Sequence, residues 1–198
     1  MRTPAPRGAA HDVASAGLPD RRRTRARARR PGGAAARPLP RCRRGPALVR
    51  TDGAPAASGW KGSASLPNLK LGVMVSDRLG LALYVPGTIY RSQGAGRPRD
   101  RVLEGALISA QAWLSERSWI LGGAGLGFDA PAVYDVKGAD ERRFYFGLGA
   151  VLGAGREVWR LGGFALDLQA RLQAAGTRAP EGTRRALALD LLVGANWY

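Results

Sequence analysis

The chain has 198 residues and a formal net charge of +16, and this length allows one domain or one domain with a tail. Residues 1–50 hold fourteen Arg and two acids, a balance of +12 (14 − 2), so the strongly basic character belongs mainly to this part. Cys42 and His11 are the only Cys and His, which excludes an internal disulfide, a Cys/His zinc site and a His-dependent catalytic triad in the rest of the chain. No apolar run approaches the ~18 residues of a transmembrane helix, although a transmembrane β-barrel needs no such run.

Residues 1–62 are built mostly from Arg, Ala, Pro and Gly, and the first aromatic residue is Trp60. Such a composition buries too little apolar surface to offset the entropy of ordering, so we predict that this basic N-terminal segment is disordered. Three interpretations compete: an arm that binds nucleic acid, a targeting segment, or a start that is not the natural one. The segment lacks an apolar h-region, and Arg without Lys is typical of GC-rich DNA translated from a misplaced start, which favours the third interpretation.

The remainder, 63–198, consists of short apolar stretches in which every second residue is apolar. In FALDLQARLQA (164–174), for example, the even positions are apolar and the odd positions are mostly polar. This period of two predicts β-strands. Seven strands are predicted, over 68–76, 79–87, 102–114, 119–128, 144–155, 163–174 and 186–198.

A helical alternative exists for some of these stretches, because Leu161, Phe164, Leu168 and Leu172 also fall at helical spacing. Neighbouring stretches such as LGGAGLGF and FGLGAVLGAG carry too many glycines for helices, since each costs about 1 kcal/mol relative to Ala. Strands need neighbouring strands, so an all-β fold is the consistent choice.

The predicted connections alternate in length along the chain. Short turns at 76–78, 115–118 and 156–160 alternate with longer polar loops at 88–101, 129–143 and 175–185. This order predicts an antiparallel up-and-down β-barrel, with all short turns at one end and all long loops at the other. About eight strands are expected, because an open edge must be closed; the sequence before residue 66 offers no convincing eighth strand, since PALVR and SGWKGSAS are poor candidates.

The polar faces of the strands separate a membrane barrel from a soluble one. They carry mainly Gly and Ala, which suit the narrow lumen of a small barrel, whereas a soluble surface should carry Lys, Glu, Ser and Thr. Apolar residues should then face lipid and polar residues the lumen. We predict that the lumen is lined by Asp167, Gln169, Arg171, Gln173 and Asp190. Such residues more often form a hydrogen-bonded network that fills the interior than the lining of an open channel. The residues predicted to face lipid are Phe164, Leu166, Leu168, Leu172, Phe144, Phe146 and Leu148, and the predicted aromatic girdle consists of Trp113, Trp119, Trp159 and Trp197.

With its turn pattern and a last strand ending in LLVGANWY, the part from 66 to 198 resembles small bacterial outer-membrane β-barrel proteins of the OmpA/OmpX type. The resemblance implies an outer-membrane location, contact with outer-membrane lipid and lipopolysaccharide, and a C-terminal strand read by the barrel-assembly machinery. In that family the last residue faces lipid, but here the more apolar parity runs from Leu187 to Trp197. Either the signal is offset by one residue or a β-bulge intervenes.

Several other features are weaker candidates for sites. Glu104 could join the lumen residues, and Arg91, Arg97, Arg99 and Arg101 could meet lipopolysaccharide phosphates. Gly122, Gly123, Gly125 and Gly127 lack the Lys-Ser/Thr pair of a phosphate loop, so they are interpreted as packing glycines. The loop DAPAVYDVKGADE does not have EF-hand spacing. We therefore predict no cofactor, no metal and no catalytic residue.

These observations favour a non-enzymatic outer-membrane β-barrel protein with a structural, adhesive or narrow-pore role. The alternative is a basic nucleic-acid-binding protein that uses the Arg-rich arm beside a small soluble barrel. No specific nucleic acid is expected under the favoured interpretation.

Overall fold

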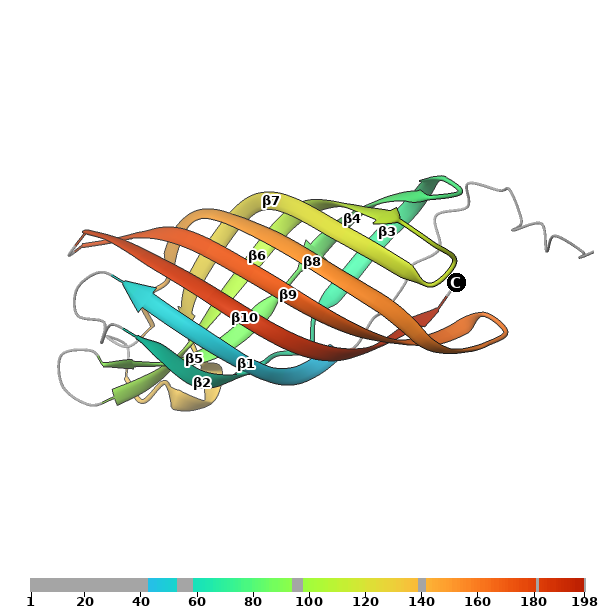
Figure 1. Cartoon of the computed structure of the whole chain (residues 1–198). Coiled ribbons are helices and arrows are strands. Elements are labelled where there is room, and N and C mark those ends of the chain that lie inside the picture. Colours follow the sequence, from blue (N-terminus) through green and yellow to red (C-terminus); the bar gives the residue numbers. More distant parts are fainter. Residues whose placement is uncertain (1–42, 53–58, 94–97, 139–141, 181, 198) are drawn as a thin grey trace, which may run out of the picture. The chain divides into compact units, whose positions relative to one another are not determined.

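The computed structural model describes residues 43–52, 59–93, 98–138, 142–180 and 182–197, all of which belong to one compact unit. They form a single antiparallel sheet of ten strands that curls into a barrel (Figure 1). Within these residues, no helix has the length and apolar character needed to cross a membrane. The elements are β1 (Arg43–Asp52), β2 (Trp60–Ser65), β3 (Leu69–Ser76), β4 (Leu79–Val85), β5 (Gly87–Gln93), β6 (Pro98–Trp113), β7 (Ser118–Pro131), the 3-10 turn η1 (Val133–Asp135), β8 (Tyr145–Leu161), β9 (Phe164–Ala179) and β10 (Gly182–Trp197).

The ten strands make eight passes along the barrel, because two passes are interrupted. Tyr84 of β4 lies opposite Leu107 and Gly87 of β5 lies opposite Glu104, three residues further on in both strands, so β4 and β5 keep one register across Pro86. Pro86 interrupts the ladder because it has no N–H to donate.

The other interruption is a β-bulge between β2 and β3. Ser65 lies opposite Thr88 and Leu69 lies opposite Val85, which sets four steps on one strand against three on its partner. The extra residue bends the strand and turns the local side chains. The two interruptions lie beside each other, because the β2–β3 pass pairs with the β4–β5 pass on both sides of them.

The sheet closes because β1 pairs with β10 and β6 pairs with β7. This ring of pairings runs through β6, β5, β2, β1, β10, β9, β8 and β7, whereas β3, among the described strands, pairs only with β4. β1 supplies the eighth pass that the predicted barrel required. PALVR lies in β1 and WKGSAS forms β2, so the interpretation of PALVR and SGWKGSAS as poor strand candidates is wrong. The domain boundary predicted between residues 62 and 63 is also wrong, since β1 and part of β2 lie before it. The disorder predicted for residues 1–62 is wrong for 43–52 and 60–62, which are strand, because both segments pair within the barrel. Residues 1–42 and 53–58 of that segment lie outside the described residues, so the interpretation of an unnatural start stays a prediction.

The connections differ from the prediction because the strands are longer. REVWR belongs to β8, and the turn is formed by Gly162 and Gly163 between the paired Leu161 and Phe164. Gly162 has φ +57°, a conformation that suits a two-residue hairpin. Most of the loops predicted at 88–101 and 175–185 is strand. We call the end with connections 77–78, 114–117 and 162–163 the hairpin end, and the end with 53–59, 94–97, 132–144 and 180–181 the loop end.

Candidate functional site

The centre of the barrel holds a buried ion pair between β9 and β10. Arg171 and Asp190 are opposite each other in the strand register, and both side chains point inward. Arg171 Nε donates to Asp190 Oδ2 at 2.8 Å, and Nη2 lies 2.7 Å from the same oxygen. The two side chains are 1% and 0% exposed, so neither charge is solvated. A buried charge is tolerated only when it is paired and hydrogen-bonded in this way.

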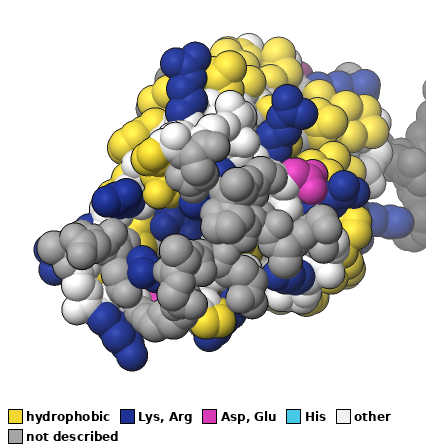
Figure 2. Space-filling view, turned by 90° about the vertical axis from the view of Figure 1, so that its left-hand side faces the viewer, with side chains coloured by type: hydrophobic (Ala, Val, Ile, Leu, Met, Phe, Trp, Pro, Cys, Tyr) yellow, Lys and Arg dark blue, Asp and Glu magenta, His cyan; other side chains and the backbone are white. Residues whose placement is uncertain are grey.

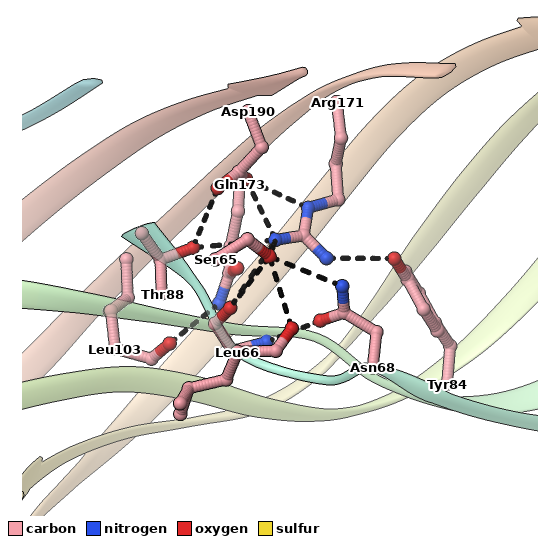
Figure 3. A network of polar contacts seen from close by, with 10 residues as sticks. Ser65, Leu66, Asn68, Tyr84, Thr88, Leu103, Arg171, Gln173 and Asp190 are labelled. Carbon is pink, nitrogen blue, oxygen red and sulfur yellow. Dashed lines mark hydrogen bonds and ion pairs between the residues drawn. The ribbon is translucent and has the colours of Figure 1, made fainter. Parts of the chain in front are cut away.

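The same guanidinium crosses the lumen to the opposite wall (Figure 3). Arg171 Nη1 donates to the Tyr84 hydroxyl at 2.9 Å, and Nη2 donates to Ser65 Oγ at 3.2 Å and Thr88 Oγ1 at 3.3 Å. The Thr88 hydroxyl in turn donates to Asp190 Oδ1 at 3.0 Å. Strands β2, β4, β5, β9 and β10 are therefore joined through one side chain, and the middle of the lumen is filled.

The interruptions in β2–β3 and β4–β5 supply partners for this network. At the β-bulge, Asn68 Oδ1 accepts from Gly87 N at 2.8 Å, and Asn68 Nδ2 donates to Ser65 Oγ at 3.3 Å. Ser65 Oγ also donates to the Gly87 carbonyl at 3.2 Å. The Gly87 N–H is thus satisfied by a side chain inside the barrel, while the Gly87 carbonyl also accepts from Leu66 N at 2.9 Å.

A second polar layer lies toward the hairpin end. Lys70 is buried, hydrogen-bonds Gln111, and places Nζ 5.4 Å from the centroid of the Trp119 ring, a cation–π distance. Asn196 Nδ2 donates to Asp167 Oδ2 at 2.9 Å, and both residues are fully buried. Polar side chains in this layer are packed among the apolar core residues Tyr84, Leu107, Trp113, Trp119, Leu121 and Val151.

A third layer closes the loop end around Asp129. Its Oδ1 accepts from Arg101 Nε at 2.6 Å and from the Tyr90 hydroxyl at 2.8 Å, and its Oδ2 accepts from Arg184 at 3.3 Å. The two guanidiniums stack on Tyr145, with Cζ atoms 4.9 and 4.6 Å from the ring centroid. A small pocket beside Asp129 and Arg184 opens at this end. Residues of five strands, β5, β6, β7, β8 and β10, are therefore gathered around one carboxylate.

The polar residues predicted for the lumen all lie inside the barrel and are buried. The structure also brings Asp190 and Arg171 together, and places Asp167 and Gln169 nearer the hairpin end. On the outer face, Leu148 is 77% exposed. The other residues predicted to face lipid share this side, although two are partly covered: Phe144, Phe146, Leu168 and Leu172 are exposed, and Phe164 and Leu166 are half-buried.

The aromatic girdle is wrong for two of its four members. Trp113 and Trp119 are 5% and 2% exposed and belong to the inner core, because their odd positions share the inward parity of Gln111 and Leu121. Nearness to a turn suggested a girdle, but strand parity decides the face. Trp159 is 46% exposed on the outer face and packs edge-on against Phe164, with centroids 5.8 Å apart. The side chain of Trp197 lies outside the described set.

The predicted cluster of arginines at the loop end is also divided. Arg101 points inward to Asp129, so it is wrongly assigned to the surface. Arg91 faces outward and bonds Asp100 at 3.1 Å, whose other oxygen accepts from the Tyr134 hydroxyl at 3.2 Å. Partial desolvation, the negative charge of Asp100 and this hydrogen bond raise the pKa of Tyr134 above its ordinary value. Arg97 lies outside the described residues.

Three smaller predictions are settled by strand parity. Glu104 alternates with the inward Leu103 and Gly105, so it lies on the outer face and does not join the lumen residues. Gly123, Gly125 and Gly127 line the inner wall and Gly122 the outer one. In β10 the inward residues are Asp190, Leu192, Gly194 and Asn196, and the pairing with β9 contains no bulge, so the apolar parity is offset by one residue.

The polar side chains of the interior bond strands on both sides of the lumen to one another. Among the described residues, no group of three or more His, Cys, Asp and Glu side chains could hold a metal ion. The sequence interpretation missed the residues that Arg171 contacts across the lumen, and it missed the cluster of donors around the Asp129 carboxylate. One signal was available: Tyr84, Thr88 and Tyr90 all stand at even positions of β4 and β5, and the even positions of these strands point inward.

A closed antiparallel barrel with polar side chains inside and apolar side chains outside defines the class of small outer-membrane β-barrel proteins. Among solved structures, the chain is similar to Neisserial surface protein A (NspA), with 20% identity, a TM-score of 0.52, and coverage of 83% of this chain and 98% of that one. It is also similar to Ail, the attachment invasion locus protein of Yersinia pestis (12% identity, TM-score 0.49, 80% and 97% covered), and to OprG from Pseudomonas aeruginosa (10%, 0.45, 83% and 98%). These likenesses show the fold. No protein-family model and no curated protein matches the chain.

Proposed function

We propose that this protein is a non-enzymatic β-barrel of the bacterial outer membrane, with a closed lumen and a structural or adhesive role. The loop end faces outward and the hairpin end faces the periplasm. The observation that carries the proposal is the inversion of the two faces: charged side chains such as Arg171 and Asp190 are buried, while large apolar ones such as Leu148 and Ile108 are exposed. Lipid is the solvent in which that distribution is stable.

The outer apolar face has the height of a membrane. On β8 the outward residues from Phe146 to Ala154 are apolar over nine residues (146–154), and Arg156 follows them. A tilted transmembrane strand needs about 9–11 residues. A soluble barrel would expose the same leucines to water over much of its surface, which monomeric soluble proteins avoid. The alternative of a small soluble barrel is therefore disfavoured.

The filled lumen supports a structural or adhesive role over a narrow pore. Arg171 contacts both walls at the centre, and the side chains bonded to Asp129 fill the loop end. Eight-stranded barrels have room for interior side chains and little else. In this proposal the C-terminal strand is read by the assembly machinery and the outer face contacts lipid and lipopolysaccharide.

Two measurements test the proposal on the full chain. The protein should fractionate with the outer membrane and migrate differently on a gel when it is not boiled, and a freely soluble product would contradict the membrane assignment. In planar bilayers it should give no steady conductance. A stable open channel would contradict the closed lumen while leaving the membrane assignment intact.

A further inference from the structure

Three outward-facing arginines stand on adjacent strands at the loop end: Arg50 on β1, Arg185 on β10 and Arg178 on β9. All three are exposed. The view from the loop end shows Lys and Arg side chains spread around the barrel, with few acidic ones among the described residues (Figure 2). The position of these three relative to one another follows from the strand register.

The register sets the arginines at successive diagonal positions. Arg50 lies opposite Leu187, two residues from Arg185. Arg185 lies opposite Gly176, two residues from Arg178. Diagonal neighbours on one face of a sheet are about 7–8 Å apart, which long side chains can bridge. Two neighbouring guanidiniums can therefore reach one phosphate from opposite sides, each with paired N–H donors.

The patch has an excess of positive charge. Asp52 is its acidic member among the described residues, and it accepts a long hydrogen bond of 3.4 Å from Arg50. Within the described ranges of the chain, no carboxylate lies within ion-pair distance of Arg178 or Arg185. Like charges held this close repel one another, and a bound anion between them would remove the repulsion.

The surroundings of the patch fit the headgroup of a lipid. Gly176 lies between the arginine positions, and a Cβ added there would meet no atom within 4 Å, so the outer surface is bare at this point. Trp60 lies opposite Arg50 in the register and is 48% exposed, as is common for aromatic residues at a membrane interface. Apolar outer-face residues follow toward the hairpin end, including Leu48, Leu148, Leu172 and Leu189.

The outer face of β5 and β6 at the loop end lacks this character. There Arg91 is paired with Asp100, and Glu104 is the next charged residue of β6 on the outer face. A negative lipid phosphate would gain little at that side. This difference favours the side of β1, β10 and β9 over that of β5 and β6 for a lipid phosphate.

We propose that Arg50, Arg178 and Arg185 form a binding site for the phosphate groups of lipopolysaccharide in the outer leaflet. The inference rests on the proposed function, since it requires the loop end to lie at that leaflet. Phosphates enter beside Gly176, the guanidiniums hold them from three strands, and Trp60 marks the depth of the headgroup layer.

The test uses the full chain refolded in zwitterionic detergent and measures its binding to purified lipopolysaccharide by co-sedimentation. The Arg50→Gln/Arg178→Gln/Arg185→Gln variant is compared with the matched hairpin-end variant Arg78→Gln/Arg117→Gln/Arg156→Gln, which removes the same charge from exposed positions. We expect the loop-end variant to bind about 100-fold more weakly, because each cation near an anionic lipid surface contributes about fivefold and three such factors multiply. The hairpin-end variant should stay within about twofold of the unaltered protein.

Further arms of the experiment identify the source of the phosphate. Lipopolysaccharide stripped of its phosphates should bind to the unaltered protein as weakly as intact lipopolysaccharide binds to the loop-end variant. An equal loss in both variants, no loss in either, undiminished binding of the stripped lipid, or equally strong binding of free inorganic phosphate would each overturn the site. The gel shift of unboiled samples shows whether all three proteins form the barrel. If the unaltered protein forms none, the proposed function fails, whereas a folded barrel with unchanged lipid binding refutes the lipid site alone.

Discussion

Two Arg–Asp pairs of this barrel have opposite surroundings. Arg171 and Asp190 lie in the centre, are almost without solvent exposure, and share further bonds with three hydroxyl groups. Arg91 and Asp100 lie at the outer rim of the loop end, where their side chains are 58% and 21% exposed. The first pair connects two walls of the barrel, whereas the second connects two neighbouring strands.

The difference shows how one residue type does different work in this fold. A buried charge that loses its partner is costly, so the central pair is required by the fold. An exposed pair contributes little because water and salt screen it. Charges inside the barrel should therefore determine stability, and charges at the rim should be available for partners.

The largest expected effect is that of Arg171→Ala. It leaves Asp190 buried without its guanidinium and should lower the free energy of unfolding by about 3–5 kcal/mol. Arg91→Ala is the matched control and should change it by less than about 1 kcal/mol. Urea unfolding in thin lipid vesicles measures both, and equal effects of the two substitutions would remove the distinction between the central and the rim pair.

A charge on the outer face tests the same distinction from the lipid side. Leu148→Arg lies in the middle of the outer apolar stretch of β8 and should lower the free energy of unfolding by about 2–4 kcal/mol. Leu161→Arg, beside the Gly162 turn at the hairpin end, should cost about 0–1 kcal/mol. The same unfolding assay applies, and a tolerated Arg at position 148 would argue against lipid around β8.

Glycines on the two faces should differ in a smaller but measurable way. A Cβ at Gly155 would lie 2.3 Å from the Trp119 ring, so Gly155→Ala forces that ring to move and should cost about 1–3 kcal/mol. At Gly122 on the outer face, the nearest atom to a Cβ is Leu152 Cδ2 at 3.7 Å, an ordinary contact. Gly122→Ala should therefore be nearly neutral by urea unfolding, and the reverse order would mean that the inner wall is less closely packed.

The smallest effect concerns the loop. The pKa of Tyr134 is raised, so its neutral form is favoured in the folded protein, and the associated stability is present below the ordinary pKa and lost as the pH rises through the raised one. Asp100→Asn removes the nearby charge and should lower the pH at which Tyr134 ionises, measured by ultraviolet absorbance. Asp52→Asn, on the other side of the loop end, should leave that pH unchanged. A shift with Asp52→Asn and none with Asp100→Asn would contradict the contact.

Strand alternation predicted the barrel and the inward face of β9 because a period of two needs only local sequence. β1 escaped prediction because RRGPALVRTD hides its inward Ala47 and Val49 among Arg, Gly and Pro. Its strand character depends on pairing with β10 and β2, which contributes nothing to the local pattern.

The partners of Arg171 could not be predicted for a related reason. Tyr84 and Thr88 lie more than eighty residues before it, and their approach depends on the Pro86 interruption and on the curvature of the closed sheet. Trp113 and Trp119 were assigned by distance from a turn, although their side-chain direction follows from counting along the strand. The basic patch of Arg50, Arg178 and Arg185 likewise appears only once three strands are in register.

The most direct test of the account is the environment of position 148. Leu148→Cys in a Cys42→Ser background, labelled with a nitroxide and reconstituted in phospholipid vesicles, reports collisions with oxygen and with a water-soluble nickel complex. We predict frequent collisions with oxygen and few with nickel, because Leu148 lies in the outer apolar face and should contact hydrocarbon. Frequent collisions with nickel would place this face in water and contradict the membrane barrel.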